Sequence, residues 1–266
     1  MGHCVRNDRK SRDDTAAERL PSDDVSTVRK LLSECPAHAV TPLRDLPALA
    51  EEAGVATLHL KDERDRMGLG SFKALGAAYA IALEASRARG DGDWATALSG
   101  RSFVTASAGN HGLSVAAGAR LFGARAIVFL SETVPKSFAD RLRAKRAEVV
   151  RAGATYEESM AAAETAAAAR DWTLLSDSSW PGYEEMPRRV MEGYLQMAAE
   201  IVDQLREPPT HILLQAGVGG MAAAVAAHAR KSWGDAPAIV VVEPDAAPAL
   251  TESARARRLV TTDGPV

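Results

Sequence analysis

The sequence predicts an α/β protein in which parallel-rich sheets are flanked by helices. From residue 103 onward, short apolar segments alternate with helical patterns, as expected for successive β–α–β units. Such units connect parallel strands through right-handed crossovers. With 266 residues, of which 46% are hydrophobic and 25% charged, the chain can bury one large core or two smaller ones.

The first 35 residues differ from this pattern because they are polar and mixed in charge. They predict a mobile N-terminal tail, or a weak helix near Val25–Leu32. A short helical pattern follows at 46–53. The alternation at 56–60 then predicts a strand, whose buried face should carry Ala56, Leu58 and Leu60, with His59 partly exposed on the other face.

A long helix is expected from Ser71 to about Gly90, with Ser71 as a possible cap. Its apolar residues recur at helical spacing: Phe72, Leu75, Ala78, Tyr79 and Leu83. Beyond it, the expected strands are 103–105, 126–130, 148–150, 172–175, 211–214 and 238–242. The expected helices between them are 112–122, 136–146, 156–169, 187–205, 220–232 and 246–255. In such sheets, ligands bind where strand ends meet helix starts.

Composition and charge argue against several classes of function. The net charge of −3, from 32 basic and 35 acidic residues, does not favour nucleic-acid binding. No segment approaches the about 20 apolar residues that a membrane span requires. The two cysteines, Cys4 and Cys35, form no cysteine–histidine cluster with zinc spacing, and their use suits a reducing cytoplasm.

Two segments carry side chains that could perform proton chemistry. Lys73 lies among apolar neighbours at an expected helix start, where desolvation would favour a neutral amine able to form an imine. Taken alone, however, an ordinary surface lysine is the better explanation. Asp177 follows the strand at 172–175, so its carboxylate could act as a base or orient an amine. The alternative is a turn aspartate that bonds its local backbone.

Two further strand-to-helix junctions are rich in small residues. At 105–112 they let a ligand approach the backbone, and Asn110 could hydrogen-bond a ring substituent, whereas His111 is better explained as a packed or surface residue. At 215–221 the glycine-rich turn suits one phosphate rather than a pyrophosphate. At each junction, a simple tight turn is the alternative.

In this order, the segments Ser71-Phe72-Lys73, 107–112, 217–220 and 241–244 resemble fold-type II pyridoxal 5′-phosphate (PLP) enzymes, the tryptophan synthase β-like group. The stretches 61–76 and 175–194 are most similar to the diaminopropionate ammonia-lyase family. The resemblance covers the chain from about Ala39 to its end.

The resemblance implies a role for each of these residues. Lys73 would hold the cofactor as a Schiff base and move the α-proton, Asn110 would contact its 3′-oxygen, and Asp177 would lie near the substrate's amino groups. The phosphate would be held by Gly217, Val218, Gly219 and Gly220. The implied reaction is α,β-elimination on an L-amino acid, giving a 2-oxo acid and ammonia, with 2,3-diaminopropionate as the first candidate substrate.

The resemblance also implies a domain organisation. We expect a polar tail at 1–35, a larger PLP-binding domain built from 36–86 and 188–266, and a smaller α/β domain at 87–187, with the cofactor between the two domains. It further implies a homodimer that acts on a small amino acid, and the cysteine usage suits a cytoplasmic location.

Two departures from the family pattern leave other functions open. Ala108 stands where the family has an aspartate that acts as base on the D-substrate, so D-isomer activity should be lost. L-serine or L-threonine dehydratases also lack an acid there and remain an alternative. Second, the sequence stops at Val266, whereas the family continues. Either a fragment or a shortened protein would explain this, with an open sheet edge and, in the extreme, cofactor binding without turnover.

Overall fold

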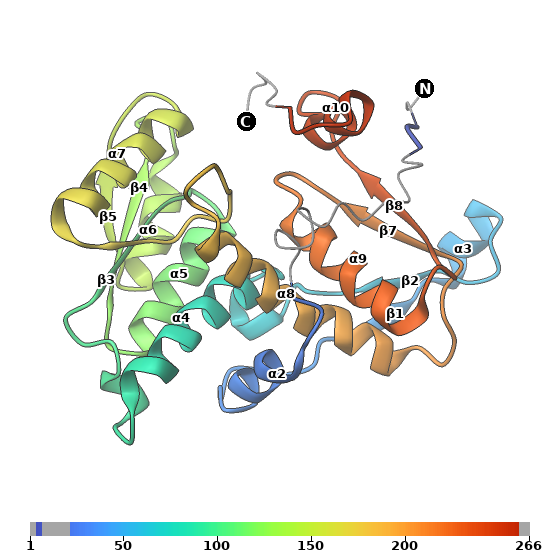
Figure 1. Ribbon diagram of the computed structural model, residues 1–266, viewed down its shortest axis with the longest axis horizontal. Coiled ribbons are helices and arrows are strands. Elements are labelled where there is room, and N and C mark those ends of the chain that lie inside the picture. The colour runs from blue at the N-terminus through green and yellow to red at the C-terminus, as the bar shows by residue number, and fades with distance from the viewer. Residues whose placement is uncertain (1–3, 7–21, 261–266) are drawn as a thin grey trace.

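The computed structural model of the protein describes residues 4–6 and 22–260. Figure 1 shows two groups of elements joined by two long helices, α4 (Lys73–Arg89) and α8 (Glu185–Gln204). The α/β fold class is confirmed, with helices packed on parallel strands in both groups. None of the helices in the described ranges is long and apolar enough to cross a membrane.

One group is built on a four-stranded parallel sheet with the strand order β5-β4-β3-β6. Its strands are β3 (Ser102–Ala106), β4 (Arg125–Leu130), β5 (Glu148–Arg151) and β6 (Thr173–Leu174). Its helices are α5 (Asn110–Leu121), α6 (Lys136–Ala144) and α7 (Tyr156–Arg170). In register, Val104 pairs with Ile127 on one side and Leu174 on the other.

Both faces of this sheet are covered, as the alternation of side chains along a strand requires. Val104 and Ile127 pack toward α7, in a cluster that contains Met160 and Ala163. Neighbouring strand residues point the other way and join the main core beneath α5 and α6; they include Phe103, Val128 and Leu130. The loops that follow the carboxyl ends of β3 and β6 are therefore carried by a sheet that is packed on both faces.

The other group contains two small sheets. β7 (His211–Gln215) and β8 (Ala238–Val242) form a parallel pair, and β1 (Leu43–Asp45) and β2 (His59–Lys61) form an antiparallel pair. The accompanying helices are α2 (Ser26–Ser33), α3 (Pro47–Ala53), α9 (Gly220–Trp233) and α10 (Ala249–Ala256), with the 3₁₀ turn η1 (Arg66–Gly68). A second 3₁₀ turn, η2 (Trp94–Thr96), lies between α4 and β3. Among the described residues, β7 and β8 pair only with each other.

Two expectations for the N-terminal region need comment. The helix alternative near Val25–Leu32 is confirmed as α2, whose residues Val28 and Leu32 are buried in the core. Most of the expected tail, at 7–21, lies outside the described residues.

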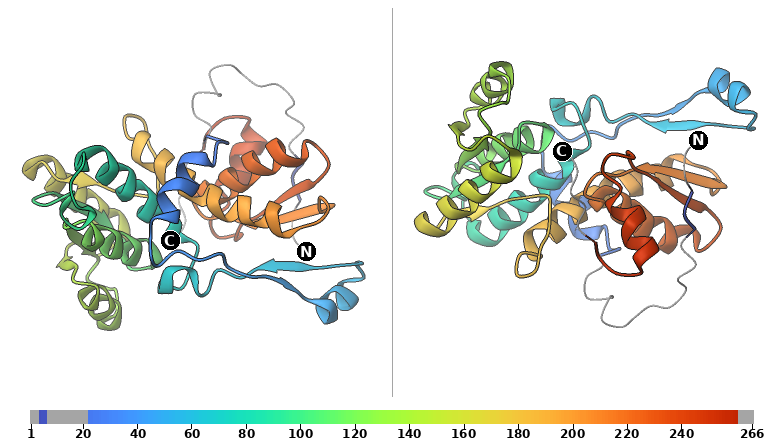
Figure 2. Two further views of the ribbon diagram at one scale, coloured as in Figure 1. Left: turned by 90° about the horizontal axis from the view of Figure 1, so that it is seen from below. Right: turned by 90° about the horizontal axis from the view of Figure 1, so that it is seen from above.

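The expected buried face of the strand at 56–60 is wrong. Ala56 and Leu60 are exposed and Leu58 is half-buried. The strand itself begins only at His59, which is exposed as expected. The reason is tertiary: β2 pairs with β1 in an arm that projects from the molecule in both views of Figure 2, so no core covers it.

The helices α4 and α8 cross at two glycines. A Cβ atom on Gly193 would lie 2.5 Å from the carbonyl oxygen of Leu75 and 2.9 Å from Cα of Gly76. A Cβ on Gly76 would in turn lie 2.7 Å from Cγ1 of Val190 and 2.8 Å from the ring of Tyr194. The two backbones can approach this closely only because neither residue has a side chain.

A buried network of charged side chains connects the segment before Lys73 to α8. Arg66 is fully buried, and its guanidinium donates hydrogen bonds of 2.7 to 2.9 Å to the carboxylates of Glu63 and Glu200. Lys61 forms a second ion pair with Glu200, at 2.7 Å. Burial alone would raise the pKa of Glu200, but the hydrogen bonds from Arg66 and Lys61 outweigh it and lower that pKa to about 2.

Replacing Gly193 with alanine should lower the free energy of unfolding by about 3 kcal/mol or more, because the new methyl group meets backbone atoms that cannot move aside. The matched control is Gly118→Ala in α5, where the nearest atom is the flexible Cδ1 of Ile81 at 3.0 Å. Urea unfolding of both variants measures the difference. Equal stability of the two variants would contradict the proposed close crossing.

Replacing Glu200 with glutamine should lower stability at pH 7 by roughly 3 kcal/mol, because Lys61 then loses its ion-pair partner and Arg66 keeps only Glu63. The folded-state pKa of Glu200 lies below its ordinary value of 4.5, so its stabilising effect is complete above pH 4.5 and is lost as pH falls through about 2. The gap between the parent and the variant should therefore close over that range in urea unfolding. Glu252→Gln, at an exposed ion pair, is the control, and a gap independent of pH would refute the assignment.

Candidate active site

Lys73 and Asp177, separated by more than a hundred residues, are in direct contact. Lys73 is the first residue of α4, and Asp177 lies in the loop that follows β6. The Nζ atom of Lys73 donates to Oδ2 of Asp177 at 2.6 Å. Both side chains are partly accessible, at 34% and 14% exposed. The structure thus brings together the two residues for which the sequence predicted proton chemistry.

The surroundings of Asp177 favour its ionised form. Burial by itself raises the pKa of this carboxyl, but the nearby His111 and Lys73 lower it further than burial raises it. The pKa of Asp177 therefore lies below its ordinary value, and the side chain is a carboxylate at neutral pH. An anion beside an amine can orient a second positively charged group.

The loop that carries Asp177 is fastened by its backbone. The N–H of Leu175 donates to Val104 of β3 at 2.8 Å, and Nε2 of His111 hydrogen-bonds the carbonyl of Leu175 at 2.9 Å. The hydroxyl of Tyr183 accepts from the N–H of Ser176 and donates to the carbonyl of Leu174, both at 2.9 Å. No pattern in the sequence singles out this function of Tyr183, because it depends on a loop that folds back on itself.

Asn110 and His111 lie at the start of α5, directly after β3. His111 is buried, which confirms its interpretation as a packed histidine, whereas Asn110 is exposed. Among the described residues, no hydrogen bond or ion pair joins Asn110 to Lys73 or Asp177. The side chain of Asn110 is therefore free to contact another molecule at this end of the sheet.

The glycine-rich turn forms the start of α9. Gly219 precedes the helix with φ +86°, a left-handed conformation that favours glycine, and no side chain caps the helix. A Cβ on Gly217 would meet no atom within 4 Å, and Val218 is 61% exposed. The turn thus combines two exposed residues, Gly217 and Val218, with a helix start whose backbone N–H groups no side chain caps, which suits a phosphate.

Tyr194 of α8 connects the glycine turn to the lysine. Its ring packs edge-on against Phe72 at 5.3 Å between centroids, directly before Lys73. The same ring would lie 4.0 Å from a Cβ on Gly220. The residue directly before the lysine and the glycine-rich turn therefore contact one buried tyrosine. An amine that can form an imine and an uncapped helix start fit the PLP cofactor that the sequence predicts.

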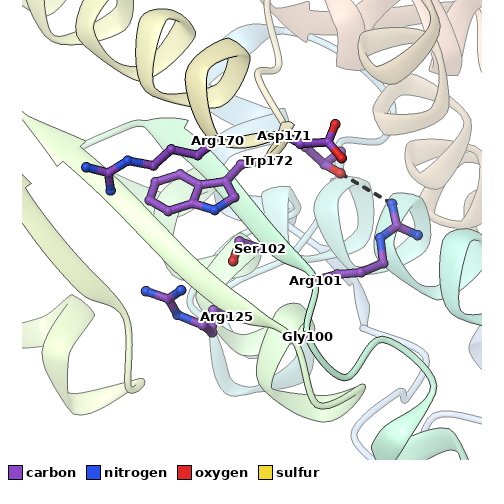
Figure 3. Close-up of a pocket in the computed structure, with 8 residues that line it drawn as sticks. Gly100, Arg101, Ser102, Arg125, Arg170, Asp171 and Trp172 are labelled. Carbon is purple, nitrogen blue, oxygen red and sulfur yellow. Dashed lines mark hydrogen bonds between the residues drawn. The ribbon is translucent and has the colours of Figure 1, made fainter.

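A pocket of about 450 Å³ lies at the opposite end of the sheet (Figure 3). Its lining includes the starts of β3, β4 and β6 and three arginines: Arg101, Arg125 and Arg170. Arg101 and Arg125 are paired with Glu84 and Glu148, at 2.9 and 2.8 Å, and Arg170 ends α7 above the Trp172 ring. These arginines neutralise carboxylates and the helix end. Because ligands of such sheets bind at the carboxyl ends of strands, this pocket is not the candidate site.

Comparisons with known proteins agree with the geometry. The family model described as "Pyridoxal-phosphate dependent enzyme" matches residues 35–265. The diaminopropionate ammonia-lyase of Salmonella typhimurium is 36% identical over 82% of this chain and 58% of its own length. A serine dehydratase-like protein of Rattus norvegicus is 30% identical over 85% of this chain and 63% of its own length.

A solved structure is also similar to this chain. It is diaminopropionate ammonia lyase from Escherichia coli in complex with an aminoacrylate-PLP azomethine reaction intermediate. It superposes with a TM-score of 0.82 at 31% identity, covering 91% of this chain and 65% of that one. The present chain thus spans less than two thirds of the length of each of these proteins.

Proposed function

The chain belongs to the family of pyridoxal-phosphate-dependent enzymes, and from this premise we propose that it releases ammonia from a small L-amino acid by α,β-elimination. The first candidate substrate is L-2,3-diaminopropionate, which would give pyruvate and ammonia. The observation that carries the proposal is the 2.6 Å contact between Lys73 and Asp177 at the carboxyl end of β6. It places an amine and a carboxylate where both can reach one substrate.

Each residue of the site has a separate task in this proposal. When bound, PLP supplies an electron sink that makes the substrate Cα–H acidic. Lys73 holds the cofactor and then takes the α-proton on its Nζ atom. Gly217, Val218, Gly219 and Gly220 bind the phosphate through backbone N–H groups, and Asn110 hydrogen-bonds the 3′-oxygen.

Asp177 favours diaminopropionate over other substrates. That substrate carries two ammonium groups, whereas serine and threonine carry only one. An ionised, largely buried carboxylate attracts an ammonium group strongly, because little water screens the pair. Asp177 would therefore bind the β-ammonium and hold it in position as the carbon–nitrogen bond breaks.

Elimination of water from L-serine or L-threonine is the second candidate, and Ala108 is the observation that favours it. This half-buried alanine directly precedes Gly109, at the position where diaminopropionate ammonia-lyases have an acid. The 30% identity to the serine dehydratase-like protein supports the same candidate. Because both reactions use the same lysine and cofactor, only the choice of substrate separates them.

The wider setting is proposed on the family resemblance. The protein would be a cytoplasmic homodimer, and its two cysteines, both free in the structure, suit a reducing compartment. We also propose a larger domain made of 36–86 and 188–266 and a smaller domain at 87–187. The arrangement in Figure 1 supports this division, since the boundaries fall near the end of α4 and the start of α8.

The first prediction from this function concerns Lys73. The purified chain with added PLP should show the visible absorption band of a lysine-bound cofactor and should release ammonia from L-2,3-diaminopropionate faster than from L-serine or L-threonine. Lys73→Ala should lack the band and lose at least about 10³-fold in rate. Lys136→Ala, at an exposed lysine, should retain both.

The possible outcomes separate the candidates. A faster reaction with L-serine than with L-diaminopropionate would replace the first candidate with the second. A band without turnover of any substrate would mean that this chain binds the cofactor without catalysis. A folded chain without the band would refute the assignment of Lys73.

A second prediction concerns the stereochemistry. Because Ala108 cannot accept a proton, the protein should act on L-2,3-diaminopropionate and not on its D-isomer. Ala108→Asp should introduce D-isomer turnover at least about tenfold above that of Ala108→Asn, since a positioned base typically contributes about 10²- to 10⁴-fold. Coupled assay of pyruvate with each pure isomer measures this. Robust D-isomer turnover by the unaltered chain would show that another group acts as the base.

A further inference from the structure

Strand β6 is an edge strand, and its outer side carries an unusual partner. Among the residues that the structure describes, only β3 pairs with it, through residues 103–104 and 173–174. On the side away from β3, the carbonyl of Leu174 and the N–H of Ser176 both bond the hydroxyl of Tyr183, each at 2.9 Å. One phenol oxygen thus takes the place that a neighbouring strand would occupy, serving one donor and one acceptor.

The tyrosine reaches this position through a tight turn between Trp180 and Tyr183. Tyr183 and Trp180 exchange backbone hydrogen bonds of 2.8 and 3.3 Å, and Gly182 between them has φ +87°. Their rings stack with centroids 4.4 Å apart. The ring and the backbone of Tyr183 are therefore held by contacts that do not involve its hydroxyl. Removal of the hydroxyl alone would leave the turn intact.

Asp177 is the residue next to the backbone that the Tyr183 hydroxyl binds. It directly follows Ser176, whose N–H the hydroxyl binds, and its carboxylate contacts Lys73. Leu175 is held from the inner side by Val104 and His111. With bonds on both sides, the segment 174–176 has little freedom to rotate, and the direction in which Asp177 leaves the sheet is set before any substrate binds.

We propose that Tyr183 is a positioning residue, whose hydroxyl holds the end of β6 so that the carboxylate of Asp177 stays at Lys73. The proposal rests on the proposed function for its catalytic consequence, because it is there that Asp177 acts on the substrate. Burial raises the pKa of Tyr183 to about 12, so the hydroxyl keeps the proton that it donates to Leu174 at neutral pH. Tyr183 itself touches neither Lys73 nor Asp177 through any bond found among the described residues.

The test is Tyr183→Phe, which removes one oxygen atom and keeps the stacked ring. Tyr79→Phe is the matched control, since Tyr79 is a buried tyrosine of α4 whose hydroxyl makes a single long contact of 3.4 Å with Glu192, away from the site. In the cofactor-free chain, amide hydrogen exchange should accelerate at Ser176 by at least about fivefold in Tyr183→Phe and remain unchanged in Tyr79→Phe. This readout does not depend on catalysis.

In the PLP-loaded enzyme, kcat/KM for L-diaminopropionate should fall by about 10- to 100-fold in Tyr183→Phe, as expected for a displaced reacting group. The change should appear in the same parameter, kcat or KM, that Asp177→Asn alters. In the Asp177→Asn background, Tyr183→Phe should cost less than about twofold, because a residue that acts only through Asp177 has nothing left to position. The visible band on Lys73 should persist.

Each outcome decides a separate question. Unchanged exchange at Ser176, or unchanged kcat/KM despite faster exchange, would overturn the role of Tyr183. A full further loss in the Asp177→Asn background would do the same, because it would indicate a general structural role. If the parent itself releases no ammonia, the proposed function fails, while the exchange comparison still decides whether the hydroxyl holds the loop.

Discussion

The crossing of α4 and α8 at Gly76 and Gly193 is the contact on which the arrangement of the site depends. Gly76 lies about one helical turn after Lys73, so the distance between the helices determines where the lysine lies. The same crossing places the ring of Tyr194 between Phe72 and Gly220. A bulkier residue at either glycine would therefore move the lysine away from the glycine-rich turn and would also loosen the packing of the core.

The segment before Lys73 needs a second anchor because its backbone is unfavourable. Met67, Gly68 and Gly70 all have positive φ, and methionine rarely adopts this conformation. Arg66, immediately before them, is held by Glu63 and Glu200 with no access to water. Burying such charges is costly in free energy. The main effect of the network is therefore to hold the loop in a single conformation, and its contribution to stability is secondary.

The sequence predicted the fold class and most element positions, because β–α–β alternation is a local signal that tertiary contacts reinforce. It failed for residues 56–60, where the alternation is real but β2 projects away from any core. The direct contact of Lys73 with Asp177 could not be derived from spacing, and the family resemblance implied only that Asp177 lies near the substrate's amino groups. The bonds of Tyr183 and the contact of Arg66 with Glu200 could not be read from local spacing, since their partners lie across a folded-back loop or on another element.

The two groups of buried charge differ in a way that their functions explain. The Arg66 network is closed, with Glu63 and Glu200 at most 9% exposed, and it has no need to open. The pair of Lys73 and Asp177 is different, because Lys73 must leave its carboxylate partner before its amine can form an imine. Lys73 is 34% exposed, so water can reach its amine when the contact with the carboxylate is broken. Partial exposure thus lets the same contact orient the lysine at rest and release it for chemistry, which a sealed pair could not do.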